Sequence, residues 1–500
     1  MLSLAIKKFH LLCIMAAVVL YTITAIHSKG YYHPDEHYQV YEFGTYKAGL
    51  TYKEHLAWEF RARVRPAIQP AMVYGAIKVL HLAGISDIVH LPMAFRILTG
   101  LLLTSVISFF VRVNLVHVRV DYHKPFILLS YFLWFLPFIN VRFTSETWSM
   151  LFFLLAISYW QKGSVNKQQV YWITGFLLGC SFLFRYQSAL LTASFAAWLL
   201  FVKKEPFRQV MPLLPGFVFM VVAGMQLDAW FYETTAITWW NYFYNIIMSG
   251  ASGFGVSPSY FYFTEITRQA TYPVGILLML AFSRLMMKRW KNLYVWLTFS
   301  FIAIHSLIPH KELRFLFPLA NFAPIILILA WQTLREQWRP PARLKAVFKI
   351  AARAIAGVAI CMNITGLAVV ARKPAGNTTK AITSFIHRHY SDQPVNLIHH
   401  SSTNPYDPWY WGPLREHIYR DRNVHFINLL DAVPERLKAT NRVNVLVIKP
   451  VHRNNPAVRE VINVLQLKEV KRSIPVWICW LLQFYDNSGD HTLLLVYADR

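Results

Sequence analysis

Two adjacent carboxylates, Asp35 and Glu36, lie in the stretch 33–39 (HPDEHYQ), directly after the first apolar segment. Pro34 is favoured at the first position of a helix, because its missing N–H would have no partner there. Asp35 and Glu36 then fall in the first turn, where the helix dipole favours negative charge. An ordinary acidic helix start explains such a pair, but a carboxylate here could also serve as a general base towards a hydroxyl.

A second polar stretch, 310–315 (HKELRF), packs four ionisable residues between two apolar runs. Ionisable groups at membrane depth are costly and indicate a functional site. Lys311 and Arg314 are spaced to share a helical face, and the planar fork of Arg314 can bind an anion through two hydrogen bonds. With His310 as a further donor, the pattern predicts a phosphate site. The alternative is a salt-bridged turn that anchors the two apolar runs.

Two more arginines follow apolar runs, Arg142 in the polar turn 142–146 (RFTSE) and Arg185 after the run 170–184. Each alone fits a structural role, because arginines at helix ends extend their head groups towards water. Together with 310–314 they would form a basic rim around an acidic group. This layout is the one expected for moving a sugar from a lipid-linked phosphate, with a carboxylate base on the acceptor and cations on the leaving phosphate.

Trp58 and Glu59 belong to an aromatic and charged stretch, 58–66 (WEFRARVRP). Tryptophan is enriched where a protein meets the membrane surface, so an interfacial aromatic belt is one interpretation. Sugar binding is the other, with the ring of Trp58 stacking on a sugar and Glu59 accepting its hydroxyl hydrogens.

The composition is that of a polytopic membrane protein. The 500 residues are 55% hydrophobic and only 15% charged, against about 25% charged in an average soluble domain. The net charge of +25 is explained by basic residues in cytoplasmic turns, and no nucleic-acid-binding signature accompanies it. The sequence contains no CxxC, GxxxxGK[ST], GxGxxG or HExxH, so metal, P-loop and dinucleotide interpretations have no local support.

The positive-inside rule places the N-terminus in the cytoplasm and residues 29–91 in one large loop on the far side. This assignment requires residues 67–83 to lie at the interface as an amphipathic element rather than to span the membrane. About eleven transmembrane helices result, at roughly 9–26, 92–111, 125–141, 147–161, 170–184, 188–202, 209–230, 271–287, 292–309, 315–333 and 350–371.

After Arg372 the hydropathy falls. Strand-like runs at 395–398, 443–448 and 491–497 alternate with helix-like runs such as 456–465, a pattern typical of α/β structure. We therefore expect a transmembrane domain over 1–371 and a small extracytoplasmic α/β domain over 372–500.

These stretches resemble one family, the dolichyl-phosphate-mannose α-mannosyltransferases of the GT-C superfamily. Residues 33–39, with the Leu-Thr-aromatic block 50–52 and the Trp-Glu-aromatic block 58–60, resemble the first lumenal loop of that family. Residues 310–315 match its His-Lys-Glu-x-Arg-Phe signature. Residues 142–146 resemble a shortened form of its Arg-Thr-x-Ser-x-x-Glu pattern, and 241–263 resemble its Asn-rich, Phe-Gly-x-x-Pro, Tyr-Phe segment.

The family includes the third and fourth mannosyltransferases of glycosylphosphatidylinositol assembly and the lumenal mannosyltransferases of N-glycan precursor assembly. The resemblance covers roughly residues 1–370, and the last 130 residues resemble no family that we can name. Tyr52 and Phe60 stand where the family usually has tryptophan. The compact sequence resembles a bacterial member, in which another polyprenol would replace dolichol.

The resemblance implies a GT-C-like fold and an inverting, metal-independent transfer from a polyprenyl-phosphate sugar to a glycan or glycolipid acceptor. The reaction would take place on the extracytoplasmic or lumenal face of a bacterial inner membrane or the endoplasmic reticulum. The lipid-phosphate sugar is the substrate, and no cofactor is implied. The roles that it suggests are general base for Asp35 or Glu36, donor phosphate binding for His310, Lys311, Arg314, Arg185 and Arg142, and acceptor or sugar binding for Trp58, Glu59 and Glu312.

Three alternatives stay open from the sequence. The chain could transfer another lipid-phosphate sugar, such as glucose or an amino sugar. It could also be a lipid-sugar flippase or transporter, although it lacks the internal repeats that transporters often show. A scaffold or receptor would give no reason for carboxylates and arginines to gather at one membrane face.

Overall fold

The computed structural model describes residues 3–248, 251–337, 341–376, 378–406, 414–419, 423–486 and 493–499. Contacts between residues divide the chain into two compact units. Unit 1 comprises Met1–Ala25, Ala62–Gln69 and Phe95–Ala371, and unit 2 comprises Ile26–Arg61, Pro70–Ala94 and Arg372–Arg500. Most of the predicted first loop therefore gathers with the C-terminal residues, and the division into domains 1–371 and 372–500 stays a prediction.

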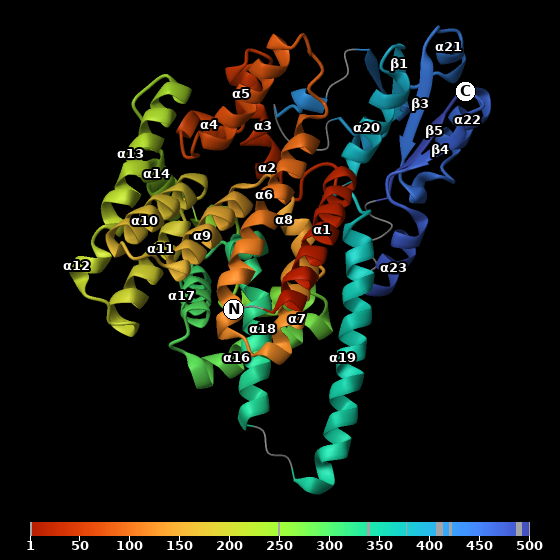
Figure 1. Ribbon diagram of the computed structural model, residues 1–500. Coiled ribbons are helices and arrows are strands. Elements are labelled where there is room, and N and C mark those ends of the chain that lie inside the picture. The colour runs from red at the N-terminus through yellow and green to blue at the C-terminus, as the bar shows by residue number, and fades with distance from the viewer. Residues whose placement is uncertain are drawn as a thin grey trace. The chain divides into compact units, whose positions relative to one another are not determined.

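The described residues of unit 1 are helical, without a strand among them (Figure 1). The helices are α1 (Leu4–His27), α6 (Leu91–Asn114), α7 (His123–Phe132), α8 (Leu136–Asn140), α9 (Ser145–Lys162), α10 (Lys167–Phe184), α11 (Ser188–Ala197), α12 (Phe207–Val210), α13 (Leu213–Tyr232), α14 (Thr238–Tyr242), α15 (Phe261–Gln269), α16 (Tyr272–Arg289), α17 (Leu293–Leu307), η7 (Leu313–Phe322), α18 (Ala323–Gln337) and α19 (Ala342–Val370).

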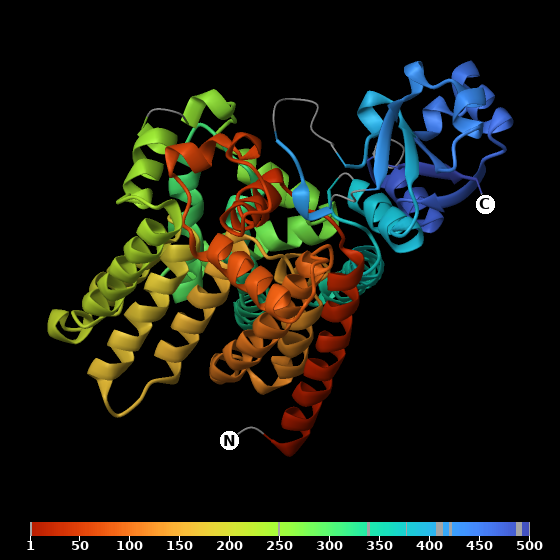
Figure 2. The ribbon, with the colours of Figure 1, turned by 90° about the horizontal axis from the view of Figure 1, so that it is seen from above.

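Close backbone contact holds α10 against α13, the gold and lime helices of Figure 2. A Cβ added to Gly175 would overlap the main chain of Leu213, and one added to Gly216 would overlap that of Trp172. Small residues permit such close packing between apolar helices, where dispersion contacts replace a hydrophobic driving force. A larger side chain at either glycine would push the two helices apart.

Five helices among the described residues are long and apolar enough to cross a membrane. They cover Leu4–His27, Leu91–His117, Phe207–Tyr232, Leu313–Gln337 and Lys349–Val370. The predicted membrane protein is confirmed, but the predicted count of eleven spans is not.

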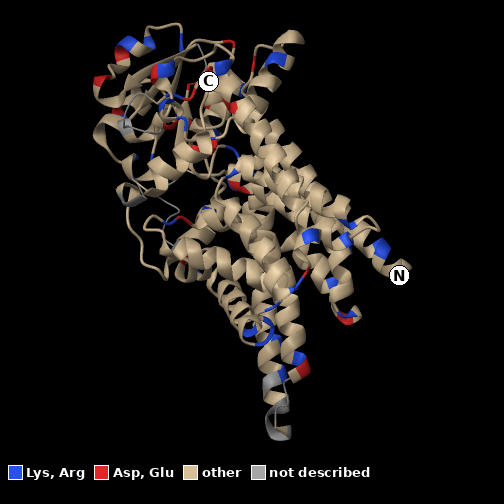
Figure 3. Ribbon diagram, turned by 90° about the vertical axis from the view of Figure 1, so that its left-hand side faces the viewer, with Lys and Arg blue, Asp and Glu red and all other residues tan. Residues whose placement is uncertain are grey.

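Several predicted spans are interrupted helices. The run 125–141 is broken between α7 and α8, and 188–202 ends in the π-helical segment η4 (Trp198–Val202). The run 315–333 begins as the 3₁₀ segment η7, which contains Pro318. Charged residues are sparse along the long helices and lie mainly near their ends, as Figure 3 shows.

The N-terminal part of unit 2 consists of short helices. They are α2 (Pro34–Tyr38), α3 (Tyr41–Lys47), α4 (Trp58–Ala62), which ends in unit 1, and α5 (Ile68–Leu82), which begins in unit 1. Helix α5 covers the element expected over 67–83. Its place at a membrane interface stays a prediction.

The C-terminal residues form the expected α/β structure. Strands β1 (Val395–His399), β2 (Val424–Asn428), β3 (Val443–Ile448), β4 (Lys468–Arg472) and β5 (Leu495–Ala498) make one sheet in the order β2-β1-β3-β5-β4. Strands β1, β2 and β3 are parallel, whereas β5 runs antiparallel to β3 and β4. Residues 491 and 492 of the predicted run 491–497 lie outside the described residues.

Helices α20 (Thr379–Tyr390), α21 (Pro434–Lys438), α22 (Pro456–Val464) and α23 (Val476–Asp486) accompany the sheet (Figure 1). Helix α20 packs Ile382 and Ile386 against Val395 and Leu397 of β1 and Val445 of β3, all of them buried. The alternation of these strands with helices follows the pattern that the sequence predicted.

Candidate active site

The stretch 33–39 folds as the helix start that its sequence predicts. His33 is the N-cap of α2, and its Nδ1 accepts a hydrogen bond from the Asp35 N–H at 3.2 Å. Pro34 occupies the first turn, and both carboxylates fall within that turn. The local rules for helix N-termini therefore place Asp35 and Glu36 side by side, with the positive end of the helix dipole near them.

The two carboxylates differ in surroundings. The Glu36 side chain is buried, and its Oε2 accepts a hydrogen bond from the Tyr32 N–H at 2.9 Å. Asp35 keeps 22% of its side chain exposed, with Oδ1 3.4 Å from Nδ1 of His33. Glu36 thus stabilises the turn before α2, whereas Asp35 is the more accessible carboxylate.

A buried pair that the sequence analysis did not identify supports α2. Nε2 of His37 lies 2.8 Å from Oε1 of Glu42, and each side chain is 1% exposed. Burial raises the pKa of Glu42 to about 7 and lowers the pKa of His37 to about 4, because an ion without water around it is destabilised. At neutral pH a neutral imidazole therefore faces a carboxyl group that readily holds a proton.

Glu416 connects α2 to the C-terminal part of unit 2. Its carboxylate accepts a hydrogen bond from the Tyr31 hydroxyl at 2.7 Å and pairs with Lys380 of α20. The ring of His37 stacks on Tyr419, with 5.4 Å between the ring centroids. Tyr31 and Glu416 are 385 positions apart in the sequence, so no local pattern could have predicted their contact.

Glu59 and Trp58 lie in α4. Glu59 is buried, and its Oε1 accepts a hydrogen bond from Nε2 of Gln39 at 2.8 Å. Gln39 is the C-cap residue of α2, so this contact joins the two predicted blocks of the first loop. Trp58 is 45% exposed, which suits an aromatic surface for a sugar.

In unit 1, one buried carboxylate joins two of the predicted basic residues. Oε1 of Glu146 lies 2.8 Å from Nη1 of Arg185 and 3.3 Å from Nη1 of Arg314. Glu146 is in the first turn of α9, whose N-cap is Thr144. Arg185 also donates to the hydroxyl of Ser145 at 3.1 Å. Glu146 was not predicted as a site residue, although its position in the stretch 142–146 is a recognisable signal.

Glu312 extends this network within the stretch 310–315. It receives two hydrogen bonds from Arg314, Nε to Oε2 at 2.5 Å and Nη2 to Oε1 at 3.2 Å. Nε2 of His310 lies 2.8 Å from Oε1 of Glu312. The structure thus forms the salt-bridged turn that the sequence offered as the alternative to a phosphate site.

Lys311 has a different set of partners. Its Nζ donates to the main-chain carbonyls of Ile308 at 2.6 Å, Ser257 at 2.8 Å and Pro309 at 3.4 Å, and the residue is 6% exposed. Carbonyl oxygens satisfy the hydrogen bonds of an ammonium without cancelling its charge. Lys311 therefore adds positive potential beside the network.

Arg142 is fully buried, and its guanidinium carbon lies 5.3 Å from the centroid of the Phe138 ring. The structure therefore brings Arg185, Arg314, His310 and Glu312 into one hydrogen-bonded network, and it places Arg142 against an aromatic face.

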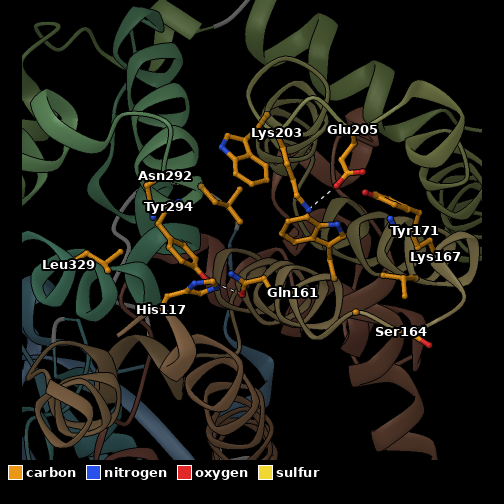
Figure 4. Close-up of a pocket in the computed structure, with 15 residues that line it drawn as sticks. His117, Gln161, Ser164, Lys167, Tyr171, Lys203, Glu205, Asn292, Tyr294 and Leu329 are labelled. Carbon is orange, nitrogen blue, oxygen red and sulfur yellow. Dashed lines mark hydrogen bonds and ion pairs between the residues drawn. The ribbon is translucent and has the colours of Figure 1, made fainter. Parts of the chain in front are cut away.

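A pocket of about 510 Å³ lies elsewhere in unit 1, with His117, Trp160, Lys203, Glu205 and Tyr294 in its lining (Figure 4). Lys203 pairs with Glu205 at 2.9 Å, and its Nζ lies 4.3 Å from the centroid of the Trp160 ring. Trp160 follows Glu146 by 14 positions on α9, or about 21 Å along a helix that rises 1.5 Å per residue. The pocket thus lies at the other end of α9 and is separate from the Glu146 network.

Comparison with solved structures supports the fold. ArnT from Cupriavidus metallidurans, in a crystal structure bound to undecaprenyl phosphate, superimposes with a TM-score of 0.52 at 11% identity, over 98% of this chain and 97% of that one. The expected GT-C-like fold is confirmed.

Curated relatives share only part of their length with the chain. GPI mannosyltransferase 3 of Yarrowia lipolytica is 25% identical over 338 residues, 66% of this chain and 63% of its own. Human GPI alpha-1,2-mannosyltransferase 3 is 25% identical over 326 residues, 62% of this chain and 55% of its own. Alpha-1,2-mannosyltransferase ALG9 of Saccharomyces cerevisiae is 31% identical over 129 residues, 25% of this chain and 22% of its own. The chain thus spans less than two thirds of the length of each of these relatives.

The family model described as the Alg9-like mannosyltransferase family matches residues 11–407. This range contains both carboxylates of α2, the Glu146 network and the whole stretch 310–315. The resemblance seen in the sequence is confirmed, and the chain belongs to the Alg9-like mannosyltransferase family.

Proposed function

We propose that the chain transfers mannose from a polyprenyl-phosphate donor to a hydroxyl of a glycan or glycolipid acceptor, with inversion at the sugar carbon. The observation that carries this proposal is the family match over residues 11–407, which includes every candidate residue. The names of the relatives support mannose as the sugar. The undecaprenyl phosphate bound to ArnT supports a polyprenyl phosphate as the leaving group.

In this proposal Asp35 is the general base. The acceptor oxygen attacks the anomeric carbon, the bond from that carbon to the phosphate oxygen breaks, and the acceptor proton passes to the Asp35 carboxylate. Asp35 suits this role better than Glu36, because Glu36 is buried and accepts a backbone hydrogen bond. Glu36 then positions the turn that carries Asp35.

The basic residues would hold the departing phosphate. Arg314 offers a planar guanidinium, and Lys311 offers a charge that main-chain carbonyls leave uncancelled. His310, Arg185 and Arg142 are further candidates for this role. In this proposal a carboxylate takes the proton of the acceptor hydroxyl, and cationic side chains stabilise the leaving phosphate. The proposed reaction therefore uses no cofactor.

The acceptor would contact Trp58, Glu59 and Glu312. Trp58 offers an exposed ring for sugar stacking, whereas Glu59 and Glu312 offer carboxylate oxygens. The positive-inside rule supports a reaction on the extracytoplasmic or lumenal face of the membrane.

The decisive experiment is sugar transfer by the purified protein in detergent. Polyprenyl-phosphate mannose, glucose and amino-sugar donors are each offered with mannose-terminated glycolipids, and the products are identified by mass spectrometry. Mannose transfer that is lost in Asp35→Asn supports the proposal. Transfer from another donor alone would favour the alternative sugar. Movement of the lipid-linked sugar across vesicles without transfer would favour a flippase.

A further inference from the structure

Three side chains with metal-ligand chemistry, none of them a candidate catalytic residue, meet in unit 2. They are Asp87 and His90, in the connection between α5 and α6, and His387 of α20. Each offers one ligand atom, and the three atoms lie within 4.8 Å of one another. Asp87 and His387 are 300 positions apart in the sequence, so no sequence motif predicts the cluster.

The orientation of Asp87 is fixed by the main chain. Its Oδ1 accepts a hydrogen bond from the Val89 N–H at 2.9 Å, and its Oδ2 lies 3.0 Å from Nε2 of His387. One carboxylate oxygen is thus held by the loop while the other faces the imidazole. Support of this kind from a second hydrogen bond commonly orients metal ligands in proteins.

The distances suit a tetrahedral ion. Zinc ligands lie about 2.0–2.2 Å from the metal, so two ligand atoms of a tetrahedral site are roughly 3.3 Å apart. The 3.0 Å between Oδ2 of Asp87 and Nε2 of His387 is close to that value. The ring centroid of His90 lies 6.1 Å from that of His387, and His90 is exposed. A side-chain rotation can therefore bring its nitrogen nearer.

We propose that Asp87, His90 and His387 form a zinc site. Two imidazole nitrogens and one carboxylate oxygen are a ligand set that favours Zn²⁺ over Mg²⁺ or Ca²⁺, which prefer oxygen ligands. Water fills the fourth position. The ion has a route of entry, because Asp87 is 50% exposed and His387 is 19% exposed.

Bound zinc would tie the loop before α6 to α20. That loop leads directly into α6 at Leu91, and α20 packs on the C-terminal sheet. A metal that links segments so far apart in sequence stabilises the folded state, since the unfolded chain does not hold the three ligands together. The site is structural, and the proposed sugar transfer does not pass through it.

The full-length protein in detergent is first treated with a chelator and dialysed. Zinc is then titrated into it, and binding is measured by calorimetry. Variants Asp87→Asn, His90→Gln and His387→Gln each remove one ligand with little change in size. Each should weaken zinc binding at least tenfold and remove the zinc-dependent rise of the thermal unfolding midpoint. The matched control is His389→Gln. His389 is an exposed histidine on the same helix whose Nδ1 contacts the main-chain oxygen of Phe385.

Zinc bound with one-to-one stoichiometry by the protein and the His389→Gln variant, but not by the three ligand variants, is the expected result. Titration with Mg²⁺ should show no comparable binding. Equal zinc affinity in all variants would overturn the proposal, and so would failure of the unaltered protein to bind zinc. In the second case Asp87 and His387 form only a surface ion pair. Sugar transfer by the His90→Gln variant reports separately on the proposed function.

Discussion

Glu146 is the residue on which the buried network of unit 1 depends. It is 2% exposed and faces two guanidinium groups, at 2.8 Å and 3.3 Å. Glu146→Gln keeps the size of the side chain and one acceptor oxygen but removes the negative charge. Arg185 and Arg314 would then lose the counter-charge that they share, whereas Arg314 would keep its contact with Glu312.

Loss of one partner of a buried ion pair typically costs 3–5 kcal/mol, because the remaining charge is left without compensation. The amide oxygen of Gln can still accept a hydrogen bond, so we expect a loss of about 3 kcal/mol in the free energy of unfolding. Removal of Arg185 in the same molecule should reverse part of this loss, because it removes one of the uncompensated charges.

Glu336→Gln is the matched control. Glu336 pairs with Arg289 at the same distance, 2.8 Å, but the two side chains are 40% and 37% exposed. An exposed pair contributes about 0–1 kcal/mol. Unfolding by denaturant in micelles, followed by tryptophan fluorescence, measures both variants. Similar losses for Glu146→Gln and Glu336→Gln would show that burial does not govern the strength of this network, and the reasoning would be wrong.

Three further predictions concern activity and pH. Asp35→Asn should lower the transfer rate by about 10²–10⁴ while donor binding survives. Glu36→Gln should be milder, and the reverse order in a transfer assay would exchange the two roles. Lys311→Ala and Arg314→Ala should each weaken donor binding about ten- to a hundredfold, and normal binding in both would leave only the salt-bridged anchor. Burial raises the pKa of Glu42 from 4.5 to about 7, so the folded state loses stability as the pH rises from about 4.5 to about 7, where only the unfolded chain has released the proton, and loses no more above that range. Glu42→Gln should therefore gain stability relative to the unaltered protein as the pH rises from about 4.5 to about 7, and a constant difference in unfolding midpoint over this range would contradict that pKa.

Local patterns predicted the parts of the structure that depend on neighbouring residues. Pro34 and the two carboxylates after it predicted the start of α2, because helix N-termini obey short-range rules. The alternation of apolar runs after Arg372 predicted an α/β sheet, and β1 and β3 lie where it indicated. Contacts between distant segments were missed, among them Glu416 with Tyr31 and Asp87 with His387. Their partners have no spacing that a sequence pattern can detect.

Hydropathy also did not show where a predicted span is interrupted. The run 125–141 is largely apolar, yet the backbone N–H of Trp134, between α7 and α8, donates to Oδ1 of Asn363 at 2.9 Å. Asn363 also donates to the main-chain oxygen of Phe132 at 2.8 Å. A single polar side chain on α19 thus satisfies the backbone where the helix is interrupted, as apolar surroundings require. Mean hydropathy does not show where a side chain replaces the backbone as the hydrogen-bond partner of a helix.

The two interpretations of 310–315, a salt-bridged turn and a phosphate site, are compatible because of the charge balance around it. Arg185 and Arg314 are paired with Glu146 and Glu312, so both guanidinium groups have a counter-charge without a substrate. Lys311 donates to three carbonyl oxygens, and its charge makes the group positive overall. An anion therefore gains from the local potential without first breaking a salt bridge. Direct contact between Arg314 and a phosphate oxygen would be a second step, in which one of its N–H groups exchanges a carboxylate oxygen for a phosphate oxygen.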